Sequence, residues 1–259
     1  MKPSTTLVKK VGWGALVTLF WLLVWQIISM MIGMDILLPS PVQVIVALFG
    51  MIVKYEFWQM LFLTVMRMVV GFLSGFVLGT VFAIFAFRHR WFARFTSPII
   101  YIVKSTPVAS FIILALCWMG TETVPTFICL LMAMPIVWAN VLAGLNAVDR
   151  KLLEMSDVFG FGFVKKLRYI YIPSILPYFT SAAETGLGLS WKAGIAAEVI
   201  CRSKYSIGNK IFESKFYLEI AEMFALTVVV VLLSVLFDKL LKFTSNKITS
   251  RLRLGGSQV

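Results

Sequence analysis

Five charged side chains interrupt long apolar stretches of this sequence, at Arg67, Lys104, Glu184, Lys192 and Glu198. A charge at the centre of a bilayer costs about 2.5–3.5 kcal/mol on insertion scales, so each of them should face protein or a water-filled path. Glu184 and Lys192 are eight residues apart on one predicted helix and therefore share a face, about two turns from each other. Lys192 and Glu198 are six residues apart and less well aligned.

Two interpretations of these charges are open. In the first, Arg67 or Lys192 attracts an anion, and Trp191 lines the same path. In the second, the charges pair with one another and hold helices together, Arg67 snorkels toward the outer surface, and Trp191 packs. We expect the structural role for Arg67 and Lys104 and packing for Trp191, whereas both interpretations stay open for Glu184 and Lys192.

Residues for other chemistries are missing from the sequence. The single histidine, His89, stands between two arginines in a predicted surface turn, and no His and Cys cluster suits a metal. No Gly-x-Ser-x-Gly elbow and no Gly-x4-Gly-Lys-Ser/Thr phosphate loop occurs. The three cysteines, two of them in apolar runs, predict no disulfide framework. An enzyme is therefore the least favoured class, and if ATP drives this protein, another chain must bind it.

The composition predicts an integral membrane protein. Of 259 residues, 60% are hydrophobic and 14% charged, and the mean hydropathy is +0.92, whereas soluble domains are about 45–50% apolar and roughly 25% charged. A crossing needs about 20 apolar residues, which leaves room for about six helices. In a soluble protein the net charge of +12 would suggest nucleic acid. Here the positive-inside rule accounts for it, so we expect a lipid bilayer and no nucleic acid as partner.

Six apolar segments follow in order, at about residues 12–33, 58–87, 95–119, 125–146, 172–200 and 221–243. Lys104 and Pro107 predict a broken or kinked third segment. Most of the 24 Lys and Arg residues fall in the loops that this arrangement places inside, with both termini in the cytoplasm. The prediction is an all-α polytopic protein with three parts: a first helix and an outer surface helix over 1–57, a main transmembrane domain over 58–243, and a basic cytoplasmic tail over 244–259.

Two local patterns refine this outline. The second segment carries Gly71, Gly75 and Gly79 at a spacing of four residues. They form a face of small residues that lets another helix approach closely. Before that segment, residues 42–57 predict a short amphipathic helix on the outer surface, because Lys54 and Glu56 interrupt it too soon for a crossing.

A polar stretch, Glu154 to Pro173, separates the fourth and fifth apolar segments. It is too polar for the bilayer, so we place it on the cytoplasmic face as a docking surface. A short helix over 149–159 can lie along the membrane, Gly160 permits a tight turn, and Pro173 starts the next membrane helix. Such an elbow can transmit motion from a soluble partner to the fourth and fifth segments. The alternative is an ordinary positive-inside loop.

In this stretch Glu154, Gly160, Ile170 and Pro173 stand at the spacing of the EAA loop of ABC importer permeases. That loop has a Glu, two small residues, a Gly six after the Glu, and then an apolar residue and a Pro. Here Met155 and Ser156 replace the small pair, and Ile172 stands where Leu is usual. The stretches 39–41, 64–71 and 187–198 also resemble the nitrate/sulfonate/taurine branch of binding-protein-dependent permeases, and the resemblance covers about residues 38–243.

The resemblance implies a type I ABC importer permease fold with a cytoplasmic coupling helix. It implies a bacterial plasma (inner) membrane, a second permease copy in a homodimer, two ATP-binding cassette subunits inside and an extracytoplasmic solute-binding protein. This chain would bind no cofactor, since ATP and magnesium would belong to the partner ATPase. The residues that would couple the chain to the ATPase subunit are Glu154, Met155, Ser156, Asp157, Gly160, Ile170 and Pro173.

For the substrate, the resemblance favours a small anion or organic solute such as a sulfonate, taurine, nitrate or a pyrimidine-type vitamin precursor. Its path would include Arg67, Glu184, Trp191, Lys192 and Glu198. Basic residues in the membrane favour an anion, but the two glutamates weaken that argument. The alternative class is an autonomous channel or ion-coupled carrier that uses Arg67, Glu184 and Lys192; a carrier predicts inverted repeats, and none is evident.

Overall fold

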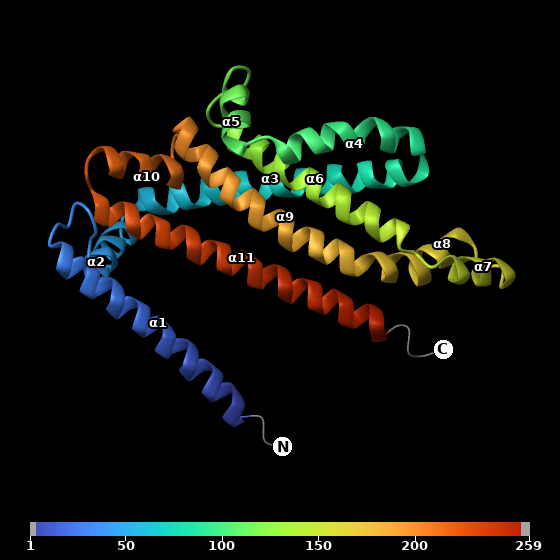
Figure 1. Cartoon of the computed structure of the whole chain (residues 1–259), viewed down its shortest axis with the longest axis horizontal. Helices are drawn as coiled ribbons and strands as arrows, with labels where there is room; N and C mark the ends of the chain where they lie inside the picture. The colour runs from blue at the N-terminus through green and yellow to red at the C-terminus, as the bar shows by residue number, and fades with distance from the viewer. Residues whose placement is uncertain (1–3, 255–259) are drawn as a thin grey trace. The chain divides into compact units, whose positions relative to one another are not determined.

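The computed structural model describes residues 4–254, and the regular secondary structure in that range is entirely helical. Residues 1–3 of the N-terminal part and residues 255–259 of the basic tail, both of which we expect in the cytoplasm, lie outside the described residues. In chain order the helices are α1 (Ser4–Ile32), α2 (Pro41–Ile52), α3 (Tyr55–Arg88), α4 (Arg90–Ser105), α5 (Val108–Leu116), α6 (Val124–Asn146), α7 (Arg150–Val158), α8 (Phe163–Lys166), the π-helix η1 (Leu167–Tyr171), α9 (Ile172–Cys201), α10 (Ile207–Phe216) and α11 (Ile220–Leu254) (Figure 1).

The chain divides into two compact units. One comprises residues 1–59 and 210–230, and the other comprises residues 60–209 and 231–259. The second unit contains both groups of residues that the sequence singled out for function.

In the first unit, the turn between α1 and α2 explains the Pro39-Ser-Pro41 motif. Gly33 ends α1 with a φ of +63°, a conformation that glycine adopts without strain. The indole N–H of Trp25 then donates to the carbonyl of Pro39 at 3.1 Å. Ser40 and Gln43 form a reciprocal capping box, and Pro41 occupies the first turn of α2.

The predicted surface helix over 42–57 is too long. α2 ends at Ile52, and α3 begins at Tyr55. A turn closed by the bond from the N–H of Lys54 to the carbonyl of Met51 separates the two helices. The apolar run that follows then continues as one helix to Arg88, which assigns Glu56 to the first turn of α3.

In the second unit, α6 and α9 run side by side, and α3 packs against α6 through its glycines (Figure 1). A Cβ added at Gly75 would lie 2.6 Å from the carbonyl oxygen of Leu130, and one at Gly79 would lie 2.6 Å from that of Met134. Only a residue without a side chain allows this approach. The structure confirms the predicted small-residue face and identifies α6 as the helix that it meets.

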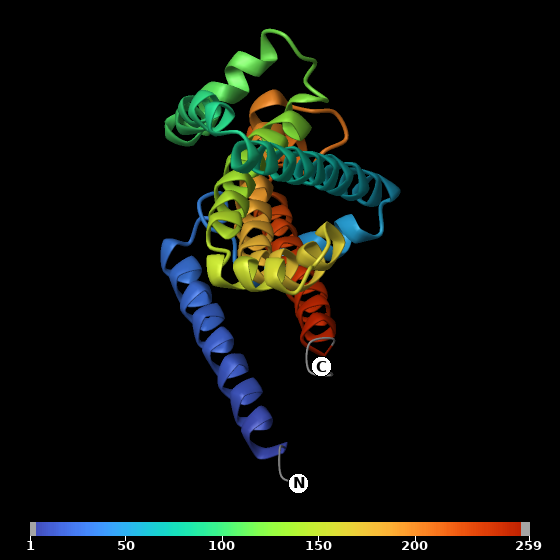
Figure 2. The same ribbon diagram turned by 90° about the vertical axis from the view of Figure 1, so that its right-hand side faces the viewer.

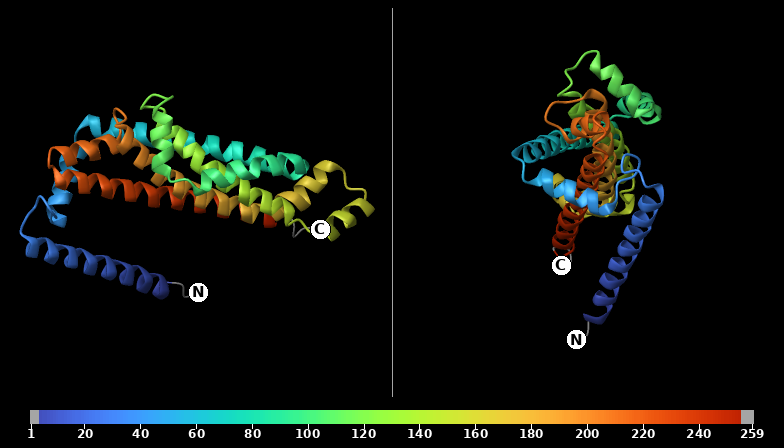
Figure 3. Two further views of the ribbon diagram at one scale, coloured as in Figure 1. Left: turned by 45° about the horizontal axis from the view of Figure 1, so that its top comes forward. Right: turned by 90° about the vertical axis from the view of Figure 1, so that its left-hand side faces the viewer.

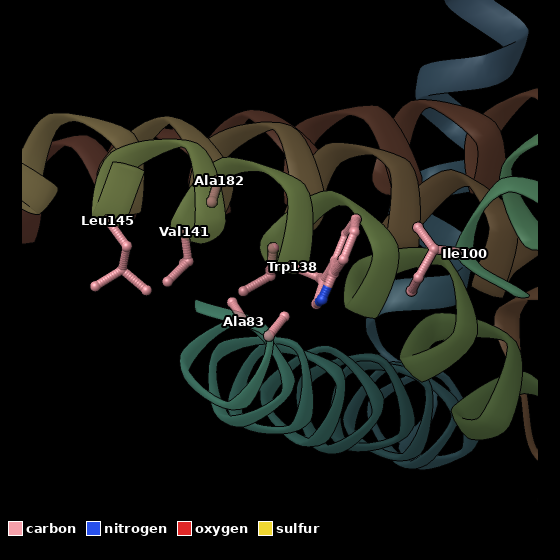
Figure 4. Close-up of a cluster of buried hydrophobic side chains, with 8 residues drawn as sticks. Ala83, Ile100, Trp138, Val141, Leu145 and Ala182 are labelled. Atoms are coloured by element: carbon pink, nitrogen blue, oxygen red, sulfur yellow. The ribbon is translucent and has the colours of Figure 1, made fainter. Parts of the chain in front are cut away.

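An apolar core holds α3, α4, α6 and α9 together in this unit. Its buried side chains, several of them drawn in Figure 4, are Ala83, Ala86, Ile100, Val137, Trp138, Val141, Leu145 and Ala182. Figure 4 shows Val141 and Leu145 of α6 directed toward the ribbon of α3. Ile100 enters the same cluster from α4, which fixes that helix against the middle of α6.

The third apolar segment is broken, as the sequence predicted. α4 and α5 meet at an angle of 101° around Thr106 and Pro107. Thr106 is extended, with φ −81° and ψ 135°, because a residue before proline is disfavoured in the helical region. Figures 2 and 3 show α5 turning away from the line of α4.

Among the residues that the structure describes, three helices are long and apolar enough to cross a membrane by length and composition: α3, α6 and the 220–245 part of α11. The bent pair α4 and α5 provides a fourth crossing if it counts as one span. α1 contributes a shorter apolar stretch, Leu16–Ile32, and α9 is 30 residues long but carries three charged side chains. The number of six crossings stays a prediction.

Candidate functional site: an elbow and a buried ionic cluster

The polar stretch after α6 begins with a well-capped short helix. The Asp149 carboxylate accepts from the N–H of Lys151 at 2.9 Å at the start of α7, which satisfies one of the free donors of a helix N-terminus. In the helix, Ser156 is buried and its hydroxyl donates to the carbonyl of Leu153 at 2.6 Å. Ser156 therefore lies on the inward face of α7.

Gly160 ends α7 as a left-handed residue. Its φ is +65°, and its N–H donates to the carbonyl of Asp157 at 3.0 Å, while the N–H of Phe161 donates to the carbonyl of Ser156 at 2.8 Å. These bonds satisfy two carbonyls at the end of the helix, as a glycine C-cap does. The predicted tight turn at Gly160 is present.

The chain then returns to the membrane helices through α8 and η1. An ion pair between Lys166 and Asp157 joins α8 to the end of α7. Ile170 is buried, and Pro173 lies in the first turn of α9, which follows η1 without a break. Because proline has no N–H, it removes one helical bond at this junction. Figure 3 shows α7 and α8 beyond the C-terminal end of α6 and the N-terminal end of α9. We call residues 149–173 the elbow.

The elbow exposes apolar side chains beside its charges. Glu154 and Asp157 are exposed on α7, and the exposed apolar side chains of this region include Met155, Val158, Phe159, Phe163 and Val164. Contiguous exposed apolar surface with a polar rim marks interaction sites. These four aliphatic and aromatic positions after Met155 gave no signal in the sequence motif, because the motif fixes the turn and not the contact side chains.

At the other end of the same unit, Arg67 and Glu198 belong to one buried ionic cluster. Arg67 on α3 donates to the carboxylate of Glu198 on α9 at 3.4 Å and pairs with Glu122 in the loop before α6. Glu198 is 0% exposed and also accepts from the hydroxyl of Thr64 at 3.0 Å and the N–H of Gly208 at 3.2 Å. A buried carboxylate needs such partners because burial removes its hydration.

This cluster joins three segments that are distant in sequence: α3, the loop before α6, and the end of α9 with the turn that follows it. The backbone N–H of Lys204 donates to Glu122 at 2.7 Å, and the hydroxyl of Ser203 donates to the carbonyl of Thr121 at 2.6 Å. Glu122 carried no functional signal in the sequence, since it stands alone in a short polar loop. The structure thus places two of the predicted path residues, Arg67 and Glu198, in contact with each other. Both also make hydrogen bonds or ion pairs with other residues of the cluster.

The remaining predicted path residues lie apart from this cluster. Trp191 is buried and packs on Phe237, with ring centroids 5.1 Å apart. Glu184 borders a cavity of about 260 Å³ with Phe72, Phe179 and other side chains of α3, α9 and α11. Lys192 is exposed. Neither Glu184 nor Lys192 makes an ion pair within residues 4–254.

Comparison with known proteins identifies the class of this helical membrane protein. Residues 75–250 match the family described as binding-protein-dependent transport system inner membrane component. That match spans more than half of the chain, and the chain belongs to this family of ABC transporter permeases.

Several proteins resemble the chain along most of its length. A Bacillus subtilis protein that carries the name aliphatic sulfonates transport permease protein SsuC is 24% identical over 93% of this chain and 88% of its own. The nitrate import permease protein NrtB of Synechocystis is 25% identical over 86% of this chain and 83% of its own. A chain of the MetNI methionine ABC transporter in inward-facing conformations shares the fold, with a TM-score of 0.61, 18% identity, and coverage of 77% of this chain and 97% of that one.

Proposed function

We propose that this chain is the transmembrane permease subunit of an ATP-driven importer for a small solute that carries an anionic group, such as a sulfonate, taurine or nitrate. Similarity to permeases named for sulfonates and nitrate supports the substrate class. Two copies would form the pathway at their interface in a bacterial plasma membrane, with both chain termini in the cytoplasm. A solute-binding protein outside would deliver the solute.

The elbow carries the proposal. α7 is anchored by buried Ser156 and by the ion pair of Asp157 with Lys166, while Phe159 is 71% exposed at the turn. A rigid helix with an exposed apolar tip can seat in a cleft of a soluble subunit. ATP binding would draw two ATP-binding cassette subunits together, and each elbow would pass that movement to α6 and α9.

No cofactor is assigned to this chain, and ATP with magnesium belongs to the partner ATPase. The energetic requirement is that the ATPase pair binds the elbows with different affinity in the inward-open and outward-open states, because a ligand without differential affinity shifts no equilibrium. Glu154, Met155 and Gly160 would contribute to this contact, and Ile170 and Pro173 would fix it to α9.

The test is co-purification from the native membrane. Phe159→Glu places a charge in the proposed contact and should reduce recovery of the ATPase subunit about tenfold or more, the cost of burying an unpaired charge. Phe216→Glu is the matched control, because Phe216 is 73% exposed on α10, far along the chain from the elbow. Equal recovery with Phe159→Glu and wild type would contradict the docking role.

A further inference from the structure

α4 has three distinct faces. One is packed into the unit, with Thr96 and Ile100 buried and Phe92 against the core. A second is exposed and apolar, and comprises Trp91, Phe95, Ile99 and Ile102. The third is exposed and polar, and it comprises Arg90, Arg94, Ser97, Tyr101 and Lys104. The residues of each face follow one another at spacings of three and four, so each set forms one stripe.

The polar face reaches deep into the membrane-spanning part of the unit. Lys104 lies ten residues beyond Arg94, about 15 Å along the helix. It also lies one turn beyond Ile100, which packs with Val137 and Trp138 near the middle of α6. α6 is one of the helices long and apolar enough to cross the membrane, so its middle should lie far from both membrane surfaces, and Lys104 is one turn from a residue that packs there.

Nothing in the described part of the chain neutralises this face. Residues 57–121 contain no Asp or Glu. Lys104 makes no hydrogen bond or ion pair within residues 4–254, so the pairing role that the sequence suggested for it is not found there. A lysine in contact with lipid at this depth costs about 2.5–3.5 kcal/mol. The apolar face of α4 can face lipid at no such cost, so we expect the polar face to meet water, a polar ligand or the second copy of the chain.

We propose that the polar face of α4 is one wall of the translocation pathway and that Lys104 contacts the anionic group of the solute as it passes. The proposal deepens the proposed function and rests on it for the identity of the solute. Charge complementarity selects the occupant: the stripe holds three cations and two hydroxyl groups and no acid, which suits a small oxyanion. Lys104 stands next to the break at Thr106, where the chain leaves the line of α4.

Cysteine accessibility tests this wall without knowledge of the solute. In full-length protein with the exposed Cys117 changed to serine, Ser97→Cys is compared with Ile99→Cys in membrane vesicles. These positions are two residues apart, on the polar and the apolar face. Each is treated with an anionic sulfonatoethyl and a cationic trimethylammonioethyl methanethiosulfonate. We expect Ser97→Cys to react with the anionic reagent about tenfold faster than Ile99→Cys, because thiolate reaction needs water.

The role of Lys104 has its own readout. Adding Lys104→Gln to Ser97→Cys should lower the ratio of anionic to cationic reagent rates about three- to tenfold, as expected for loss of one charge about 10 Å away. Lys104→Arg should preserve the ratio. Equal reactivity at positions 97 and 99, or a ratio that Lys104→Gln leaves unchanged, overturns the proposal. Both readouts are independent of ATP, so failure of ATP-driven uptake would count against the proposed function alone.

Discussion

The guanidinium of Arg67 on α3 lies 3.4 Å from the carboxylate of Glu198 on α9, across 131 residues of sequence. Arg67 is 13% exposed and Glu198 is 0% exposed. Thr64 and the N–H of Gly208 complete the partners of the carboxylate, whereas Glu122, the second acid of Arg67, is 42% exposed. The two ion pairs of one arginine therefore differ in burial, and they should differ in their effect on stability.

Replacing Glu198 should destabilise the protein strongly. Glu198→Leu leaves Thr64 and Gly208 without an acceptor and removes the buried partner of Arg67, and breaking a buried pair typically costs about 3–5 kcal/mol. Glu122→Leu should cost about 1 kcal/mol or less, as exposed pairs do. The measurement is the melting temperature of the detergent-solubilised protein, and equal shifts for the two variants would contradict the assigned burial.

The double variant Arg67→Met with Glu198→Leu separates the pair from the rest of the cluster. Glu198→Leu alone leaves the charge of Arg67 without its buried partner, whereas the double variant removes both charges. The loss of stability in the double variant should therefore be smaller than the sum of the two single losses by about 1–3 kcal/mol. Additive losses would show that Arg67 and Glu198 do not act as a pair in the membrane protein.

The glycine face of α3 predicts a steric effect that depends on position. Gly75→Ala places a Cβ 2.6 Å from the carbonyl oxygen of Leu130, so α3 and α6 must separate, and we expect a loss of about 1–3 kcal/mol. Gly50→Ala on α2 is the control, because nothing lies within 4 Å of the added Cβ, and alanine gains about 0.5–1 kcal/mol over glycine inside a helix. Thermal unfolding of both variants should give shifts of opposite sign.

The capping box of α2 makes a local prediction. Ser40→Ala removes the acceptor for the N–H of Gln43, 3.3 Å away, and should cost about 1 kcal/mol in the first turn of the helix. Ser74→Ala is the control, since the hydroxyl of Ser74 only bonds back to the carbonyl of Val70 within α3. Hydrogen exchange in residues 41–45 should accelerate with the first variant and stay unchanged with the second.

Hydropathy predicted the helices, and the helix-breaking Pro107 predicted the break in the third apolar segment. Both signals act locally, through burial of the backbone in lipid and through the missing N–H of proline. They could not predict the partners of Arg67. Spacing placed Glu198 and Lys192 on one helix. Which distant residues meet Arg67, Glu122 among them, depends on how α3 packs against α6 and α9. The same limit applies to the elbow: the motif predicted the turn at Gly160, whereas the exposed Phe159 and Val158 became evident only from the structure.

The turn at Gly160 can be tested apart from the docking contact, because two glycines in the elbow differ only in backbone conformation. A Cβ at Gly160 or at Gly162 would meet nothing within 4 Å, but Gly160 has a φ of +65° and Gly162 a φ of −66°. A left-handed conformation costs an L-residue about 1–2 kcal/mol. Gly160→Ala should therefore raise local opening of the elbow about five- to thirtyfold.

Hydrogen exchange of residues 150–171 measures this opening. Gly162→Ala should leave the exchange rates within about twofold of wild type, because alanine adopts its backbone conformation without strain. Gly160→Asn should fall between wild type and Gly160→Ala, since asparagine visits the left-handed region more readily than other side chains do. If Gly160→Ala and Gly162→Ala exchange alike, the left-handed turn does not hold the elbow, and the rigidity that coupling requires must come from the ion pair between Asp157 and Lys166.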